Sequence, residues 1–515
     1  MNSARSLIDS HRRSLAWIAG VLIALPLILA GGISPVLTLA LPLLALVGLL
    51  VMRWPIVGLA LLVASIPVQD LASVGSGEAS LTATRVGLLL ALFGYAATIT
   101  FGQQPLRGSR LLIPFVALVI WMAGTAATSL DQAAGAADVF RWTTALLTLV
   151  IALQLLVGAS KRTVLTIIAV TAAVGAVEAG FGGVLGILGI GPASFRVENA
   201  FARAFGTFGR PNTFGGYLEM TVFPVLWVSV YSIGETFRRL SHYRRLRPVG
   251  FHESSEARRD TIRSALLTGL LVASTATMLW GVLLSFSRGA WLGVAAGLVV
   301  SLVVALRRFW VTVLALAPIV MLAVAFASGQ LGSSVVGERF GSILDEARPF
   351  DAASITITPE NFAVVERMAH WQAGWRMFID DPLTGVGAGN FNASYPDYFV
   401  RSTFRISQGH AHNFYIQVLA ENGIPGLLLY VTVAISFLLL ALLVALRSTD
   451  AFSRALALGA VGSLSAVYLH NVFENLHVLN LSVQISLVWA LTVVAHRRWR
   501  YESSRDDGDV EYSRR

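Results

Sequence analysis

The sequence predicts an all-α polytopic membrane protein with about 12–14 transmembrane helices. Its 515 residues are 55% hydrophobic and only 13% charged, and the mean hydropathy is +0.70. A soluble chain of this length could not bury so much apolar surface. Apolar runs long enough to span a bilayer recur from end to end. Helices and closed barrels both satisfy the backbone hydrogen bonds in lipid. Continuous apolar runs favour helices over a barrel.

The apolar runs give the order of the predicted spans. They lie near 15–33, 35–52, 54–69, 84–101, 110–129, 139–158, 162–185, 213–233, 264–286, 289–306, 309–327, 424–446, 453–471 and 478–496. The first run has a basic start but no small-residue cleavage site, so we expect a retained span and not a removed signal peptide. The short runs within 35–69 also fit one hairpin or a re-entrant pair.

These spans divide the chain into five predicted regions. They are N-terminal transmembrane helices (1–190), helices with an outer arginine segment and a basic cytoplasmic loop (191–327), an extracytoplasmic loop containing helices (328–412), C-terminal transmembrane helices (413–497) and a polar cytoplasmic tail (498–515).

Basic residues predict the orientation of the chain. The net charge is +9, and the basic clusters all fall on one side if the N-terminus starts inside: Arg53, 103–110, 160–162, 238–259, Arg307 with Arg308, 447–454 and 496–500. We therefore expect both termini in the cytoplasm. The positive net charge is then explained by cytoplasmic loops, and we expect no nucleic-acid partner. The chain has no cysteine, which excludes disulfides, thiolate metal sites and cysteine nucleophiles.

The large outer loop is expected to contain a helix and a glycine-rich turn. Thr358 is a good N-cap, and Pro359 suits the first helical position. The stretch "PLTGVGAGNF" follows that helix. No strand precedes its glycines, so the pattern indicates a turn and not a nucleotide-binding loop.

Arginines in the outer segments point to an anionic ligand. Arg203 and Arg210 lie in "AFARAFGTFGRPNTF", and Arg288 lies in "SFSRGAW" at a tight outer turn. The planar guanidinium fork suits phosphate oxygens, so we expect an anionic ligand with a lipid tail. Arginines near helix ends also snorkel to headgroups, which is the alternative reading for each of them.

Ionisable residues within the spans crowd toward their outer ends. Such groups are costly at membrane depth and mark a functional-site candidate; the two glutamates can also simply pair with the arginines. The residues are Arg85, Asp138, Arg141, Glu178 and Glu219.

The pair His410 and His412 is the candidate for proton transfer. Alternate residues of an extended segment point to opposite sides, which predicts different roles for the two imidazoles. No Asp, Glu or Cys set with ligand spacing accompanies the pair, which argues against a metal site. No nucleophile elbow supports a serine hydrolase. A neutral imidazole at the outer surface can act as a general base.

Other residues near the pair have simpler interpretations. His370 and His477 are interpreted as structural. The aromatic stripe of Trp371, Trp375 and Phe378 fits packing or an interfacial belt better than a sugar platform.

Four stretches resemble the O-antigen ligase and polymerase superfamily. They are, in order over roughly 200–430, "RAFGTFGRPNTFGGYL", "SFSRGAWLGVAAGL", "ERMAHWQAGWRMFIDDPLTGVGAGNF" and "HAHNFYIQVLAENGIPGLLLY". Each stretch is weak alone, and together they are fairly specific.

The resemblance implies a metal-independent, inverting membrane glycosyltransferase of the bacterial inner (cytoplasmic) membrane, without a cofactor. The donor would be a glycan on polyprenyl (undecaprenyl) diphosphate, and the acceptor another glycan or a lipid core, in lipopolysaccharide or surface polysaccharide biosynthesis. Carried over by motif, Arg203 and Arg288 would hold the diphosphate, with Arg210 as a weaker third candidate. His412 would be the base, and His410 would orient or assist. The supporting residues would be Glu219, Asn413 and Tyr415.

Two alternatives stay open at this point. A ligase and a polymerase share this chemistry and differ in the acceptor. A transporter of lipid-linked substrates is the rival from another class, although transporters tend to bind near the bilayer midplane between repeats. The polar residues here crowd the outer ends of the spans, which favours the transferase.

Overall fold

The computed structural model describes residues 35–69, 73–74, 81–102, 107–197, 201–246, 251–307, 350–358 and 361–513. The predicted spans 15–33 and 309–327 lie outside these residues, and so do 328–349 of the predicted outer loop.

The described residues are mostly helical, with only two short strand pairs, which confirms the predicted fold class. The α-helices are α2 (Pro35–Arg53), α3 (Ile56–Ser65), α4 (Ala83–Gly102), α5 (Leu112–Ala127), α6 (Gln132–Leu156), α7 (Lys161–Ile187), α8 (Pro211–Leu246), α9 (Phe251–Leu284), α10 (Arg288–Leu306), α13 (Phe362–Asp380), α14 (Phe391–Tyr398), α15 (Phe414–Arg447), α16 (Ala451–His470) and α17 (Leu481–Ser513).

Short elements complete the described fold. Two antiparallel ribbons pair β1 (Ser73–Val74) with β2 (Leu81–Thr82) and β3 (Arg196–Val197) with β4 (Phe201–Ala202). Single 3₁₀ turns are η2 (Ala193–Phe195), η3 (Gly206–Phe208) and η4 (Ser402–Phe404).

The helices match the predicted spans. Every span predicted within the described residues coincides with a helix. Eight of the described helices are long and apolar enough to cross a membrane: α4, α6, α7, α8, α9, α10, α15 and α16. The helices α3 and α5 are shorter and also apolar. The chain is therefore a multi-pass membrane protein.

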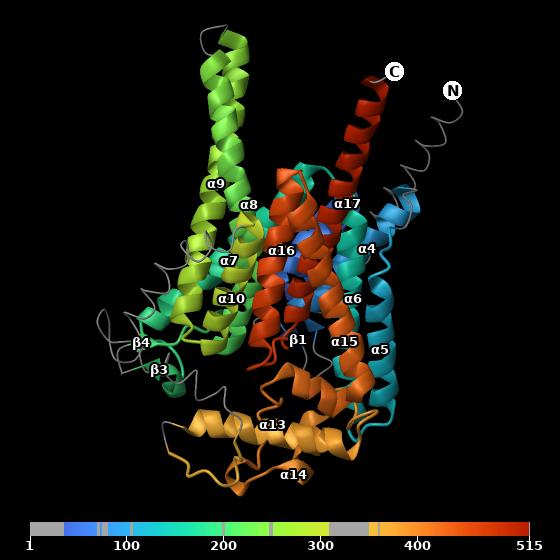
Figure 1. The fold of residues 1–515 in the computed structure, drawn as a ribbon, viewed down its shortest axis with the longest axis vertical. Helices are drawn as coiled ribbons and strands as arrows, with labels where there is room; N and C mark the ends of the chain where they lie inside the picture. Colours follow the sequence, from blue (N-terminus) through green and yellow to red (C-terminus); the bar gives the residue numbers. More distant parts are fainter. Residues whose placement is uncertain are drawn as a thin grey trace.

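The predicted basic loop 234–263 is mostly helical, so its interpretation as a loop is wrong. The helices α8 and α9 run on and leave only 247–250 between them. Glu235 pairs with Arg238 and Arg239, at 2.9 Å in each case. Ion pairs three and four residues apart favour helix even where the side chains are polar. Figure 1 shows this hairpin projecting beyond the bundle, on the same side as the end of α17.

The opposite end of the bundle carries the loop helices α13 and α14, which lie across it in Figure 1. We call this the loop end. The helix predicted to start after Thr358 begins instead at Phe362, with Asn361 as its N-cap residue. The Asn361 side-chain oxygen accepts from the backbone N–H of Thr358 at 2.8 Å. Pro359, predicted at the first helical position, lies outside the described residues.

The helix α15 is broken at Gly423, where φ is 62°. A Cβ at this position would lie 2.2 Å from the backbone oxygen of Leu383, so only glycine fits. The backbone N–H of Ile424 donates to Pro382 at 2.9 Å, and that of Val386 donates to Ala420 at 2.8 Å. The glycine-rich segment, a turn as predicted, is thereby fixed to the first turns of α15.

Candidate functional site

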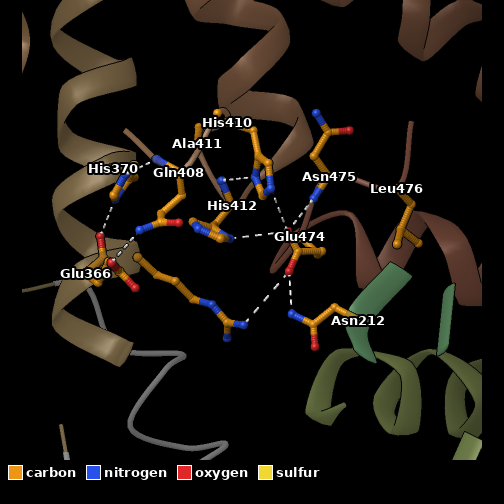
Figure 2. Close-up of polar contacts among 12 residues, drawn as sticks. Asn212, Glu366, His370, Gln408, His410, Ala411, His412, Glu474, Asn475 and Leu476 are labelled. Carbon is orange, nitrogen blue, oxygen red and sulfur yellow. Dashed lines mark hydrogen bonds and ion pairs between the residues drawn. The ribbon is translucent and has the colours of Figure 1, made fainter. Parts of the chain in front are cut away.

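Three side chains converge at the loop end of the bundle (Figure 2). Glu474 Oε1 lies 3.2 Å from His412 Nδ1 and 3.5 Å from His410 Nε2. The histidines come from the segment before α15, and Glu474 comes from the loop between α16 and α17. Glu474 and His410 are buried, and His412 is half-buried. We call these three residues the His–Glu cluster.

The two imidazoles do not point to opposite sides, so that prediction is wrong. His412 adopts φ 55°, in the left-handed region and not in extended backbone. This turn brings both rings onto one carboxylate oxygen, and their centroids lie 4.3 Å apart. A non-glycine residue in that region costs about 1–3 kcal/mol and is typical of functional sites. The strained conformation is what gathers the cluster.

Glu474 is the site residue that the sequence reasoning missed. It lies 62 residues after His412, in a short connection between helices, and no local pattern marks it. The backbone anchors it: the N–H of Phe414 donates to the carbonyl of Asn471 at 2.8 Å, which ties the histidine segment to the same connection.

The charges of the cluster are set by burial and by neighbours. Burial alone would raise the pKa of the Glu474 carboxyl, but the two imidazoles and the Arg367 guanidinium hold that pKa well below its usual range. Burial, with the neighbouring His412, lowers the pKa of His410 to about 3. Glu474 is therefore an anion, and His410 is a neutral imidazole.

Hydrogen bonds fix the ring nitrogens of both histidines. The N–H of His412 donates to His410 Nδ1 at 3.1 Å, so the proton of neutral His410 is on Nε2, toward Glu474. His412 Nδ1 faces the same carboxylate, which can only accept, and so carries a proton. His412 Nε2 is buried without a hydrogen-bond partner among the described residues. In a neutral ring protonated at Nδ1, this nitrogen carries the lone pair.

Helix α13 supports the cluster from the side of the loop. Trp371 Nε1 donates to the carbonyl oxygen of His412 at 3.1 Å. His370 is buried, and its Nε2 accepts from the backbone N–H of Gln408 at 3.3 Å. The contacts of His370 agree with its interpretation as structural. Trp371, a member of the aromatic stripe, holds the backbone of His412.

A polar chain links the predicted diphosphate-binding segment to the cluster. Arg203 Nη2 donates to Asn212 Oδ1 at 3.0 Å, and Asn212 Nδ2 donates to Glu474 Oε2 at 2.6 Å. Arg203 Nε also donates to the carbonyl of Ser285, just before α10. Arg367 Nη2 lies 4.0 Å from Glu474 Oε2. Arg203 is thus two hydrogen bonds from the cluster.

The other two predicted arginines lie nearby. Arg288 is the first residue of α10, follows the N-cap Ser287 and is half-buried. Arg210 is exposed and immediately precedes α8, and its charge contributes to the lowered pKa of His410. The structure thus brings cationic side chains from two segments to the end of the bundle where the histidines lie.

The three predicted supporting residues hold the helices. Asn413 caps α15 by accepting from the backbone N–H groups of Tyr415 and Ile416. The Tyr415 hydroxyl donates to the carbonyl of Tyr468 at 2.7 Å. Glu219 Oε1 lies 3.0 Å from His470 Nδ1 inside the bundle. Glu219 therefore pairs with a histidine and Glu178 bonds Thr207, in place of the arginine partners considered from the sequence.

The cluster also has the composition of a metal site. The ligand atoms of His410, His412 and Glu474 all lie within 4.8 Å of one another. Two imidazoles and a carboxylate are a zinc-type set, so the expectation that no carboxylate accompanies the histidines is wrong. The hydrogen bond between His412 and Glu474 and the 3.5 Å contact between His410 and Glu474 account for the same closeness without an ion.

The fold and the site define a multi-pass membrane protein with the His–Glu cluster beside arginines at one end of its bundle. Residues 273–431 match the family model described as O-Antigen ligase, which confirms the resemblance to the O-antigen ligase and polymerase superfamily. The matched part is about a third of the chain. It contains Arg288, His410 and His412, whereas Arg203 and Glu474 lie outside it. A search of curated proteins found no match.

Proposed function

We propose that this protein is a membrane glycosyltransferase of the O-antigen ligase type. It moves a glycan from polyprenyl (undecaprenyl) diphosphate to an acceptor hydroxyl at the outer face of the inner membrane, with both termini cytoplasmic. The observation that carries the proposal is the His412 imidazole. Its Nδ1 faces the Glu474 carboxylate, and its Nε2 is buried with no hydrogen-bond partner in the part of the chain that the structure describes.

His412 acts as the general base in this proposal. Its Nε2 takes the proton of the acceptor hydroxyl as that oxygen attacks the anomeric carbon. The Glu474 carboxylate fixes the tautomer that presents Nε2 and stabilises the imidazolium that forms, as a carboxylate does for histidine in a catalytic triad. The role of His410 is to face the same carboxylate with Nε2 and to accept the backbone N–H of His412 at Nδ1.

The arginines stabilise the leaving group. As the new glycosidic C–O bond forms, the bond from the anomeric carbon to the phosphate oxygen breaks, and the polyprenyl diphosphate departs with the bonding electrons. Arg203 and Arg288, with Arg210 as the weaker candidate, neutralise that charge, so no strong acid is required. A single attack opposite the departing oxygen inverts the anomeric carbon. The Asn212 bridge keeps the base and Arg203 in one network.

The reaction is proposed to be independent of metal. The protonated His412 Nδ1 and the Glu474 carboxylate already satisfy each other, and the arginines supply the positive charge that a metal would bring to the diphosphate. Inactivation by a chelator, with recovery on adding Zn²⁺, would contradict this part of the proposal.

The test is transfer by the purified protein in liposomes with a polyprenyl-diphosphate-linked glycan and an added acceptor. His412→Ala should lower the transfer rate by about 10²–10⁴-fold, while donor binding stays. His242, exposed on α8, provides the matched control His242→Ala, which should behave as wild type. Movement of the donor across the bilayer without bond cleavage would support the transporter instead. The product identifies the acceptor and so separates ligase from polymerase.

A further inference from the structure

A cavity of about 260 Å³ lies beside the His–Glu cluster. Its walls come from the ends of α5, α6 and α15 at the loop end, and the loop residue Gly389 and Asn392 of α14 also line it. The polar side chains that define its chemistry are Asp138, Arg141, Gln417 and Glu421. The mechanism proposed above uses none of these four residues.

The cavity lies on the opposite side of the cluster from Arg203, the residue proposed to bind the donor diphosphate. Gly409 and Asn475 line it, and they are the chain neighbours of His410 and Glu474. Figure 2 shows Asn475 and Asn212 on opposite sides of Glu474. Asn212 leads to Arg203. The cluster thus separates a side with diphosphate-binding arginines from a side with this cavity.

The charges of the cavity do not suit a diphosphate. Arg141 pairs with Asp138 on the same helix, so the one guanidinium in the lining is offset by a carboxylate. Glu421 adds a further carboxyl group, and its Oε1 accepts from the backbone N–H of Phe391 at 2.9 Å. Without surplus positive charge, the cavity disfavours an anionic ligand.

The polar and aromatic groups of the cavity suit a neutral sugar. Carboxylate and amide side chains offer both acceptors and donors to hydroxyl groups. Trp142, Phe414 and Tyr430 also line the cavity and add apolar aromatic surface to it. The volume is below the ~300 Å³ at which pockets for drug-sized ligands begin, so it accommodates a single sugar residue and not a long chain.

We propose that this cavity binds a neutral sugar residue of the acceptor glycan. The word "acceptor" rests on the proposed function, whereas binding of a neutral sugar does not. The donor diphosphate and the acceptor sugar would then approach the His–Glu cluster from its two sides. The acceptor hydroxyl would be delivered to the base from the side away from the departing diphosphate.

A cavity-filling variant with a neighbouring control tests the proposal. Ala137 lines the cavity, whereas Ala136 is exposed and does not line it. Saturation-transfer NMR on the full chain in nanodiscs would use glucose, galactose and N-acetylglucosamine as probes, with inorganic pyrophosphate as the anionic probe. Ala137→Phe should weaken sugar binding by about tenfold or more, and Ala136→Phe should leave it unchanged. Both variants should still bind pyrophosphate, which shows that they are folded.

Three outcomes would overturn the cavity assignment. They are no binding of any of the three sugars by wild type, equal binding by the two alanine variants, and competition between pyrophosphate and the sugars. The transfer assay reports separately on the proposed function. Sugar binding that is lost only in Ala137→Phe supports the cavity even if no transfer occurs. Normal sugar binding by Ala137→Phe overturns the cavity even if transfer proceeds.

Discussion

Glu474 is the positioning residue on which the chemistry at His412 depends. Glu474→Gln keeps the size of the side chain but removes the charge, and an amide can present a donor to His412 Nδ1 in place of an acceptor. We expect transfer to fall by about 10²–10⁴-fold, as when a general base is lost. The double variant with His412→Ala should be no slower than either single variant, because residues that act as a unit are not additive.

A matched control and a pH profile separate positioning from folding. Glu366 lies on α13 and bonds Gln408 at 3.3 Å, so Glu366→Gln removes a carboxylate near the cluster without touching the imidazoles. It should retain most activity. Glu474→Gln should also change the pH dependence of transfer, which a purely structural role would not do. Additive losses in the double variant would contradict the shared role.

The arginines should respond to geometry as well as to charge. If Arg203 and Arg288 hold the diphosphate, Ala at either position should raise the KM for the donor about 10–100-fold, the cost of a lost hydrogen bond to a charged group. Lys should rescue only in part, because it lacks the bidentate fork. Arg376→Ala, at an exposed position of α13, is the control and should be silent.

Two outcomes would change this assignment. Full activity in Arg288→Lys would indicate a simple charge role. Normal donor KM in both Ala variants, at normal expression, would remove the diphosphate site.

At the scale of single residues, sequence motifs predicted most of the candidate site. The remaining residue, Glu474, was found only from the tertiary structure. Both histidines and Arg288 stand in recognisable stretches, so the sequence could nominate them. Glu474 could not be nominated because its meeting with His412 depends on how α15, α16 and α17 pack. The φ of 55° at His412 could not be predicted either. Histidine and asparagine are both enriched in left-handed backbone, and nothing in "GHAHN" singles out the second histidine.

At the scale of elements, the docking of the loop onto the bundle should weaken in acid. Burial lowers the pKa of His410 to about 3 and that of His370 to about 4, whereas an unfolded histidine titrates near ~6.5. The unfolded segment therefore binds more protons between these values, and stability is lost as pH falls below about 6.5. By about pH 5 each histidine contributes a loss of roughly 2 kcal/mol.

Hydrogen exchange of residues 361–413 at about pH 7.5 and about pH 5 measures this effect. His370→Gln removes one of the titrating groups and should reduce the pH dependence, while His242→Gln on α8 should not. The depressed pKa of Glu474 stabilises the folded state at pH values above the pKa of an unfolded glutamate, near ~4.3. This contribution is lost only as the pH falls through the folded pKa, so it stays intact at about pH 5. Protection factors that are equal at both pH values would contradict the prediction.

Helices were easier to predict than their ends. The length of the apolar runs alone located the spans, because the thickness of the bilayer sets the length of a spanning helix. It could not show that α8 and α9 continue as helices through a basic stretch, since that depends on ion pairs such as Glu235 with Arg239. It also could not show that Asn361 displaces Thr358 as the start of α13.

At the scale of the whole molecule, the prediction is one of sidedness. The chain has no cysteine, so a single introduced cysteine reports its side of the membrane without background. Ser402 at the loop end and Thr449 between α15 and α16 are both exposed. In intact spheroplasts, an impermeant maleimide should label Ser402→Cys and should leave Thr449→Cys unlabelled until the membrane is opened.

The opposite labelling pattern would overturn the site proposal, since the histidines and arginines would face the cytoplasm. The fold class itself does not depend on that result. Hydropathy predicted an all-α membrane protein, because few solutions satisfy backbone hydrogen bonds in lipid. How α13 and α14 lie across the bundle depends on contacts between distant residues, which hydropathy does not report.

The break at Gly423 has a mechanical consequence for the site. Transmembrane helices tilt to match the thickness of their bilayer, and the outer end of a rigid rod swings sideways as it tilts. In α15 the rod is interrupted at Gly423. The first turn of α15 is tethered to the carbonyl of Asn471, and the 382–386 turn is bonded to Ala420 before the break and to Ile424 directly after it. We therefore expect tilting of the span to be absorbed at the break, so that the distance from His412 to Glu474 changes little with bilayer thickness.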